Sequence, residues 1–237
     1  MNEEERLRRT IDGQQTSSLE YVKYFCICDC LTLGMPEGYT AMGAGLELFI
    51  NKFNPGEKYI QPFANKLPKG EEGKYRPLAY KIPKSIDAFI WSPFHDALSS
   101  HWDLGDGCRH AYRFKGELLR KLGLATRAKD PTIQETKKHI LLMNEKIDKI
   151  WNVPKKLLVF YEHSRVKNVQ IRKELDRYNN MASKLLDWPV LQVELSDTDA
   201  KDASEKDIKK WWGWEHYSKE TYLNIYNEIK RIINDGT

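Results

Sequence analysis

The sequence predicts an α/β fold, a three-layer α/β/α sandwich around a mostly parallel, five-stranded sheet. Two observations predict it. Short apolar segments rich in aromatic and β-branched residues recur along the chain, and the longer stretches between them carry apolar residues at helical spacing. Strands that alternate with helices of this length indicate crossover connections between parallel strands. The five expected strands are 21–27, 59–63, 86–91, 156–161 and 190–195.

The first expected strand, 21–27, is the most aromatic of the five and runs directly into a turn. Aromatic and β-branched residues favour a buried strand, and Gly34 with Pro36 ends the segment with turn-forming residues. Asp29 and Cys30 therefore lie just beyond the end of a sheet strand, where side chains are exposed.

Between the first and third strands, a helix, a strand and a loop are expected. Apolar residues in 41–53 recur on one face of a helix, and Asn54-Pro55-Gly56 ends it. Residues 59–63 are expected to form the second strand, at the edge of the sheet. Residues 65–77 are rich in Gly, Pro, Lys and Glu, which is typical of a loop.

The middle of the chain is expected to form one strand and a long helical crossover. Residues 86–91 form a short apolar run that leads at once to His95 and Asp96. Residues 107–151 carry helical periodicity in two successive segments, with Pro131 expected in the first turn of the second, where its missing N–H is tolerated.

The last third continues the alternation of strands and helices. An amphipathic helix is expected over 169–186, between the fourth and fifth strands, and a charged loop over 197–210. Ser218 is the expected N-cap of a final helix, because the residues that follow it place one apolar face toward the core. These face residues are Tyr222, Ile225, Tyr226, Ile229, Ile232 and Ile233.

Composition favours one domain of 237 residues, with residues 1–20 as a polar N-terminal arm and 21–237 as the domain. The net charge is only +4 and acidic residues are interspersed with basic ones, so no nucleic-acid partner is expected. The sequence contains no run of about 18 apolar residues and no apolar core of a signal peptide, which predicts a cytoplasmic protein without a membrane partner.

The four cysteines, Cys26, Cys28, Cys30 and Cys108, do not have the spacing of a disulfide framework. Three of them occupy alternate positions at and just after the end of the first expected strand, where neighbours are poorly placed to form a bridge. The absence of a Cys-x-x-Cys pair argues against a zinc site. We therefore expect neither a metal nor another cofactor.

Three short motifs resemble the blocks of the SGNH, or GDSL-type, hydrolases. Cys28-Asp29-Cys30-Leu31-Thr32-Leu33-Gly34 resembles the first block, Gly-Asp-Ser-Leu-Thr-x-Gly, after a strand. Pro93-Phe94-His95-Asp96 resembles the third block, Gly-x-Asn-Asp. His216, followed by Ser218 and Tyr222, resembles the last block, Asp-x-x-His before a helix. The resemblance covers 21–234 in outline and implies a flavodoxin-like, SGNH-type sandwich.

The resemblance implies an ester hydrolase or acyltransferase with Cys30 as the nucleophile and His216 as its base. His95 would donate to the oxyanion, as would a backbone N–H at Gly70 under a looser alignment, with Asp29 and Asp96 in support. A thiol beside an imidazole is a competent nucleophile, because a nearby imidazolium lowers the thiol pKa. The expected substrate is a small or carbohydrate-linked acyl ester, for which aromatic side chains would form a platform. These are Trp212, Trp214 and Tyr217.

The chain departs from the family pattern at positions that carry catalysis in the family. Cys28 and Pro93 replace glycines, Cys30 replaces the serine, His95 the asparagine and Gly213 the aspartate. The alternative is therefore an inactive SGNH-fold protein that serves as a ligand-binding or interaction module.

Two other motifs lead to weaker hypotheses. Asp12-Gly13-Gln14-Gln15 resembles a fragment of a motif in ParB-like nuclease and NTPase modules, although a surface turn explains it as well. His101-Trp102-Asp103 has the His-x-Asp spacing of iron oxygenases. We set this second motif aside because helices, and not strands, are expected after it.

Overall fold

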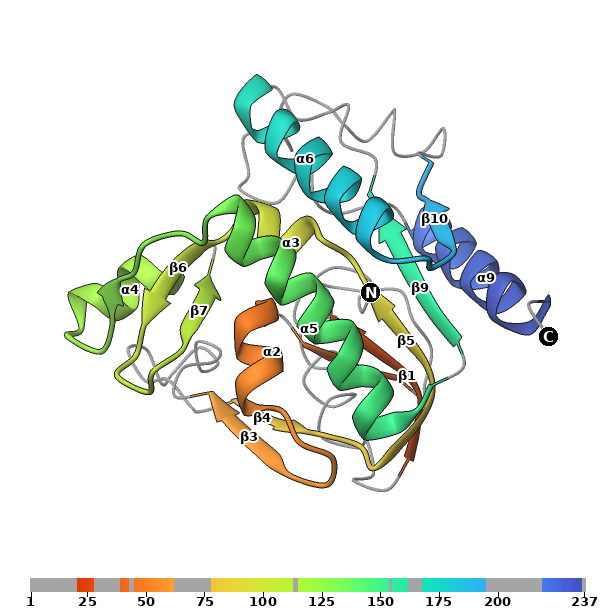
Figure 1. Ribbon diagram of the computed structural model, residues 1–237, viewed down its shortest axis with the longest axis horizontal. Coiled ribbons are helices and arrows are strands. Elements are labelled where there is room, and N and C mark those ends of the chain that lie inside the picture. Colours follow the sequence, from red (N-terminus) through yellow and green to blue (C-terminus); the bar gives the residue numbers. More distant parts are fainter. Residues whose placement is uncertain are drawn as a thin grey trace.

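A parallel sheet of five strands forms the centre of the computed structural model (Figure 1). The structure describes residues 21–27, 39–42, 45–61, 78–112, 115–153, 155–161, 168–194 and 219–235. The sheet has the spatial order β10-β9-β5-β1-β2, and each neighbouring pair is parallel. Its strands are β1 (Tyr21–Ile27), β2 (Tyr39–Met42), β5 (Ser85–Trp91), β9 (Lys155–Phe160) and β10 (Val190–Gln192). The predicted α/β class with a mostly parallel sheet is confirmed.

The prediction for the second strand was wrong. The segment expected at 59–63 forms β3 (Lys58–Gln61), which pairs antiparallel with β4 (Leu78–Lys81) in a separate two-stranded sheet. The edge strand next to β1 is instead β2. Because β2 has only four residues and follows the turn residues Pro36 and Gly38, it carries almost no strand signal of its own.

The long crossover contains strands that the helical periodicity did not reveal. β6 (Ser100–Asp103), β7 (Arg109–Tyr112) and β8 (Thr126–Arg127) form a three-stranded sheet, with α4 (Lys115–Lys121) between β7 and β8. Helix α5 (Ile133–Trp151) follows. The reason given for setting aside His101-Trp102-Asp103 is therefore wrong, because the strand β7 does follow that motif and pairs antiparallel with it.

Helix α5 begins at a capping box. The side chain of Thr132 accepts a hydrogen bond from the N–H of Glu135 at 3.2 Å, and Glu135 Oε2 accepts one from the N–H of Thr132 at 2.8 Å. Pro131 therefore precedes the N-cap. The prediction that it lies in the first turn of this helix was wrong. The helix ends at Asn152, which adopts a left-handed conformation with φ of 47°.

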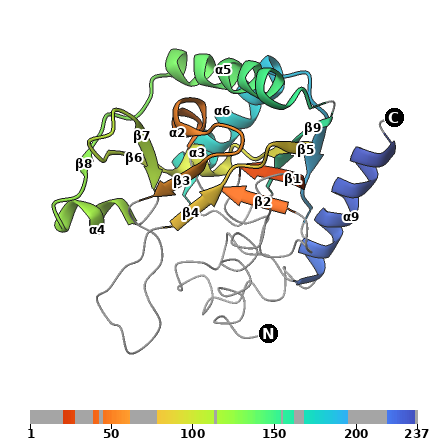
Figure 2. The same cartoon turned by 90° about the horizontal axis from the view of Figure 1, so that it is seen from below.

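Alternate side chains of the strands enter two different cores, as the pleat of a strand dictates. Phe25 and Phe89 point to the face covered by α2 (Leu46–Lys52), α5 and α6 (Val169–Leu185), whereas Cys26 and Ile90 point to the face covered by α9 (Lys219–Asp235). Figure 2 shows α2 and α5 together on one side of the sheet. Burial on both faces explains the nearly continuous apolar strands.

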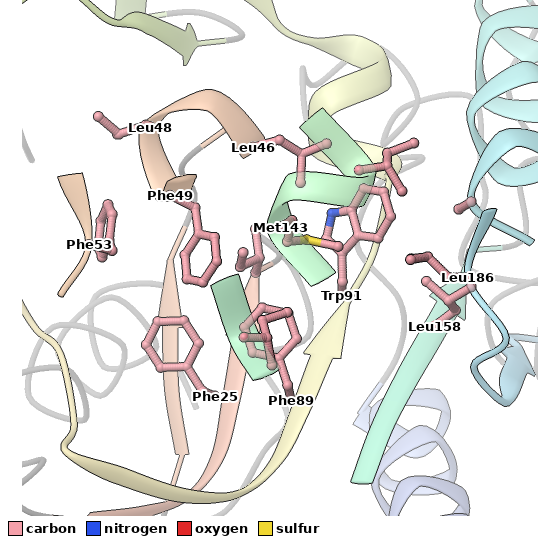
Figure 3. Close-up of a cluster of buried hydrophobic side chains, with 14 of the residues drawn as sticks. Phe25, Leu46, Leu48, Phe49, Phe53, Phe89, Trp91, Met143, Leu158 and Leu186 are labelled. Atoms are coloured by element: carbon pink, nitrogen blue, oxygen red, sulfur yellow. The ribbon is translucent and has the colours of Figure 1, made fainter. Parts of the chain in front are cut away.

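The first of these cores contains a cluster of aromatic rings among its aliphatic side chains (Figure 3). The ring centroids of Phe25 and Phe89 on neighbouring strands lie 5.8 Å apart, and Phe49 of α2 lies 5.6 Å from Phe89. These distances are typical of favourable aromatic pairs.

No described helix has both the length and the apolar character that crossing a membrane requires.

Gly45, the N-cap of α2, has no room for a side chain. A Cβ built there would lie 2.7 Å from Cβ of Ala111 and 3.3 Å from Oδ1 of Asp96. We expect Gly45→Ala to lower the free energy of unfolding by about 1–3 kcal/mol, the range typical of overpacking. Denaturant unfolding measures this loss. The double variant Gly45→Ala with Ala111→Gly should regain part of it, and a double variant no more stable than Gly45→Ala would contradict the steric explanation.

Candidate active site

The carboxyl ends of β1 and β5 lie side by side. The two strands pair in register up to Ile27 and Trp91, and the N–H of Ser92 donates to the carbonyl of Ile27 at 3.1 Å. Strand order reverses here, because β2 follows β1 in the chain but lies on the far side of it from β5. Such a switch point is where open parallel sheets bind ligands. The chain therefore leaves both strands at the place where a binding site is expected.

The segment after β5 is held close to the sheet. Ser92 is buried, and its side chain accepts a hydrogen bond from the N–H of Phe94 at 3.5 Å. The short helix α3 (Phe94–Leu98) begins here, and the ring of Phe94 lies 5.1 Å from that of Tyr161, which directly follows β9. An aromatic pair thus joins the carboxyl ends of β5 and β9.

Asp96 links α3 to α2. Its side chain is only 5% exposed, and Oδ1 accepts a hydrogen bond from the N–H of Leu46 at 2.8 Å. Leu46 is the first residue of α2, and its N-cap, Gly45, has no side chain to satisfy that N–H. A carboxylate is favourable at this position because the helix N-terminus carries a partial positive charge. Asp96 therefore caps a helix that lies fifty positions away in the sequence.

Behind Asp96 lies Tyr178 of α6. Burial, followed by the negative charge of Asp96, raises the pKa of Tyr178 to about 12, while a hydrogen bond with Thr136 acts in the opposite direction. The phenol of Tyr178 is therefore neutral at physiological pH. It contributes a polar group to the interior without adding a second negative charge beside Asp96.

Arg109 ties three elements together near the same place. Its Nε lies 2.5 Å from Oε2 of Glu47 in α2, and its Nη2 lies 3.1 Å from Oε1 of Glu135 in α5. The pKa of Glu135 is lowered to about 2. The largest cause is its hydrogen bond with the backbone of Thr132, followed by that with the Thr132 side chain, and the charge of Arg109 acts in the same direction. The guanidinium is thus shared between the carboxylates of Glu47 and Glu135.

Asp96 and Tyr178 on one side, and Glu47 and Arg109 on the other, line a cavity of about 10 Å³. That volume admits about one water molecule and is too small for a substrate. The cluster therefore supports the carboxyl edge and does not itself hold a reactant. The residues that line the cavity are Gly45, Leu46, Glu47, Asp96, His101, Arg109, Pro131, Thr136, His139 and Tyr178.

The His-x-Asp motif on β6 has partners of its own. Nδ1 of His101 lies 2.9 Å from Oδ1 of Asp130, which also receives two hydrogen bonds from Arg127. Asp103 is exposed and accepts a hydrogen bond from the N–H of Gly105 at 2.7 Å, as in a turn. Within the described part of the chain, no group of three potential metal ligands occurs.

Among the site residues expected from the sequence, the structure describes the side chain of Asp96 alone. His95 belongs to α3, and only its backbone is described. The other expected residues lie outside the described ranges: Asp29, Cys30, Gly70, Trp212, Trp214, His216 and Tyr217. The cluster around Arg109 was missed, because its members come from distant segments, and only the Thr132 and Glu135 capping box left a local signal.

The direction of α9 follows from a pocket at the opposite edge of the sheet. Ile232 and Ile233, near the end of α9, line this pocket together with Lys155 at the start of β9. The C-terminal end of α9 therefore lies at the end of the sheet where the parallel strands begin, which we call the amino edge; the carboxyl edge is the end where the strands finish. An α-helix of 17 residues is about 25 Å long, which exceeds the length of β9. Tyr222, in the first turn of α9, belongs to the same buried cluster as Phe94 and Tyr161, which follow the carboxyl ends of β5 and β9, so α9 begins near these ends. His216 precedes its first residue, Lys219, by three positions.

Comparisons with known proteins give no relative: no family model, no curated protein and no solved structure matches this chain. Its function must therefore be inferred from its residues and their geometry.

Removing the carboxylate of Asp96 should leave the buried N–H of Leu46 without its acceptor. We expect Asp96→Ala to lower the free energy of unfolding by about 1.5–3 kcal/mol, the range for a hydrogen bond to a charged group. Asp96→Asn keeps an acceptor oxygen and should lose clearly less. Urea unfolding of the two variants measures the difference. Equal losses in both would show that the hydrogen bond is not what stabilises α2.

His139, which lines the small cavity, should make the protein less stable in mild acid. Burial lowers its pKa below 6.5, so the folded protein binds the proton less readily than the unfolded chain. Stability should therefore fall as the pH drops through 6.5. His139→Gln cannot titrate, and its stability relative to the wild type should rise between pH 8 and pH 5. Parallel stability curves over this range would contradict the explanation.

Proposed function

We propose that this protein is a divergent SGNH-type ester hydrolase or acyltransferase that uses Cys30 and His216 at the carboxyl edge of its sheet. The observation that carries the proposal is the register of β1 with β5. Because Ile27 pairs with Trp91, the chain segments that lead to Cys30 and to His95 leave the sheet side by side. Two of the three motifs that resemble SGNH blocks thus begin at one place.

The strand order supports an SGNH-type sandwich. Numbered along the chain, the five parallel strands have the order 2-1-3-4-5, which is the flavodoxin-like order. In that arrangement the ligand site lies where the first and third strands end, here β1 and β5. Helices on both faces of the sheet are consistent with a three-layer arrangement.

The direction of α9 supports the pairing of Cys30 with His216. Three residues of chain reach at most about 10 Å, so His216 stays within that distance of the start of α9. Because α9 begins near the carboxyl edge, the imidazole and the thiol belong to the same edge of the sheet in this proposal. Trp212, Trp214 and Tyr217 flank His216 and would form the platform for the acyl ester or its sugar.

The proposed reaction forms a thioester on Cys30. The thiolate attacks the ester carbonyl, and the N–H of Cys30 with His95 stabilises the oxyanion, with Gly70 as a further donor. The C–O bond then breaks, and the imidazolium of His216 gives its proton to the departing alkoxide. Water, or the hydroxyl of an acceptor, attacks the thioester next while His216 takes a proton from it. The acid or a new ester leaves, and the thiol is restored.

A second candidate is a ligand-binding module without turnover. Pro93 is buried at the position of a family glycine, and it has no N–H that could donate to an oxyanion. Asp96, which the resemblance places in support, is bonded to the N–H of Leu46. Both observations fit an edge that keeps the architecture of the site while having fewer groups for chemistry.

Hydrolysis of a chromogenic acetyl ester separates the two candidates. The wild type should hydrolyse the ester and show an acyl-enzyme by mass spectrometry, whereas Cys30→Ala and His216→Ala should lose about 10³-fold or more in rate. The matched control is Cys108→Ala, which should leave the rate unchanged. Cys108 is a buried thiol, and its burial raises its pKa.

The serine variant tests whether the site has been rebuilt or lost. Activity that is absent from the wild type and appears in Cys30→Ser would indicate an edge whose other groups remain competent. Inactivity of the wild type and of Cys30→Ser would sink the hydrolase proposal and favour the binding module.

A further inference from the structure

A second cavity, of about 380 Å³, lies at the amino ends of β9 and β10, at the opposite edge of the sheet from the proposed active site. Its volume falls within the range of small-molecule pockets. It is formed by α5, the start of β9, the connection before β10 and the end of α9. The lining residues are Asn144, Val153, Lys155, Lys156, Asp187, Trp188, Pro189, Ile232 and Ile233.

Asn144 is held in one orientation by two neighbours. Its Oδ1 accepts a hydrogen bond from Nε1 of Trp188 at 3.1 Å and another from Nζ of Lys156 at 2.9 Å. Both neighbours can only donate, so the oxygen of the amide must face them and its NH₂ group must face elsewhere. No described residue accepts a hydrogen bond from that NH₂ group, which leaves two donors for a ligand.

The two lysines of the cavity differ in how far their charges are already paired. Nζ of Lys156 pairs with Asp148, bonds to Asn144 and lies 5.6 Å from the centroid of the Trp188 ring. Lys155 is half-buried, and its side chain forms no ion pair or hydrogen bond with any described residue. Lys155 is therefore the cation at this cavity that lacks a described counter-charge.

The rest of the lining is mainly apolar. Val153 and Ile233 are buried, and Ile232, Pro189 and the ring of Trp188 extend this apolar surface. The polar groups are mostly donors. Asp187 is the only carboxylate among the described lining residues, and its negative charge disfavours a ligand with two or more negative charges.

We propose that this cavity binds a small monocarboxylate with an apolar aromatic or aliphatic body. The carboxylate meets the ammonium of Lys155 and the NH₂ of Asn144, and the apolar body lies against Trp188 and the isoleucines of α9. A single negative charge suits one cation that has no described counter-charge, and the apolar surface selects against small hydrophilic anions. This binding site is separate from the proposed catalytic edge and does not depend on catalysis there.

Calorimetric titration of the full chain with 2-naphthoate, and with its neutral analogue 2-naphthamide, tests the proposal. We expect saturable one-to-one binding of 2-naphthoate, and binding at least about tenfold weaker for the amide. Lys155→Met should weaken 2-naphthoate binding by a similar factor. Lys173→Met, which removes an exposed lysine from α6, should leave it unchanged. Equal affinity for acid and amide, or equal effects of the two lysine variants, would overturn the proposal.

Ile232→Trp locates the bound molecule independently of charge. The larger side chain should fill part of the cavity and weaken 2-naphthoate binding, while Lys155 stays in place. Protein alkylated at Cys30 should still bind, which separates this site from the proposed active site. Unchanged binding in Ile232→Trp, loss of binding on alkylation, or no saturable binding by the wild type would each refute the assignment.

Discussion

The pairing of β1 with β5 is the constraint on which the rest of the structure depends. The register runs from Tyr21 opposite Ser85 to Ile27 opposite Trp91, and it decides which side chains enter which core. Phe25 and Phe89 then stack on one face, whereas Cys26 and Ile90 fill the other. A slip of one residue would exchange the two faces of a strand. Because β2 and β9 pair with the outer sides of these two strands, the whole sheet inherits their register.

The same constraint explains which parts of the fold could be predicted from sequence. Residues 86–91 and 156–161 were recognised because burial on both faces makes a strand a continuous apolar run. The strands β2, β4, β6, β7 and β8 have two to four residues each and no apolar run that marks them, so they were missed. The strand expected at 59–63 does exist, but local pattern does not say which sheet a strand joins.

The candidate site shows a similar division. Asp96 was singled out by its resemblance to a family motif, yet its partner, the N–H of Leu46, lies fifty positions earlier in the chain. Arg109 likewise joins Glu47 and Glu135 from two other elements. Such contacts follow from the packing of α2 and α5 onto one face of the sheet, and no local pattern indicates them. The capping box at Thr132 is the exception, because both of its partners lie within one helical turn.

The two edges of the sheet use their polar residues differently. Near the carboxyl edge, Arg109 is shared by two carboxylates and Asp130 is bonded to His101 and Arg127, around a cavity of about 10 Å³. These groups satisfy one another, so they hold the framework on which a reactive thiol would stand. At the amino ends of the strands the cavity is about 380 Å³. The same kinds of contact fix Asn144 and Lys156 there, while the side chain of Lys155 has no counter-charge among the described residues. Polar groups that already pair with one another make the framework rigid, and a donor without a described partner at a cavity of this size is what the proposed carboxylate site requires.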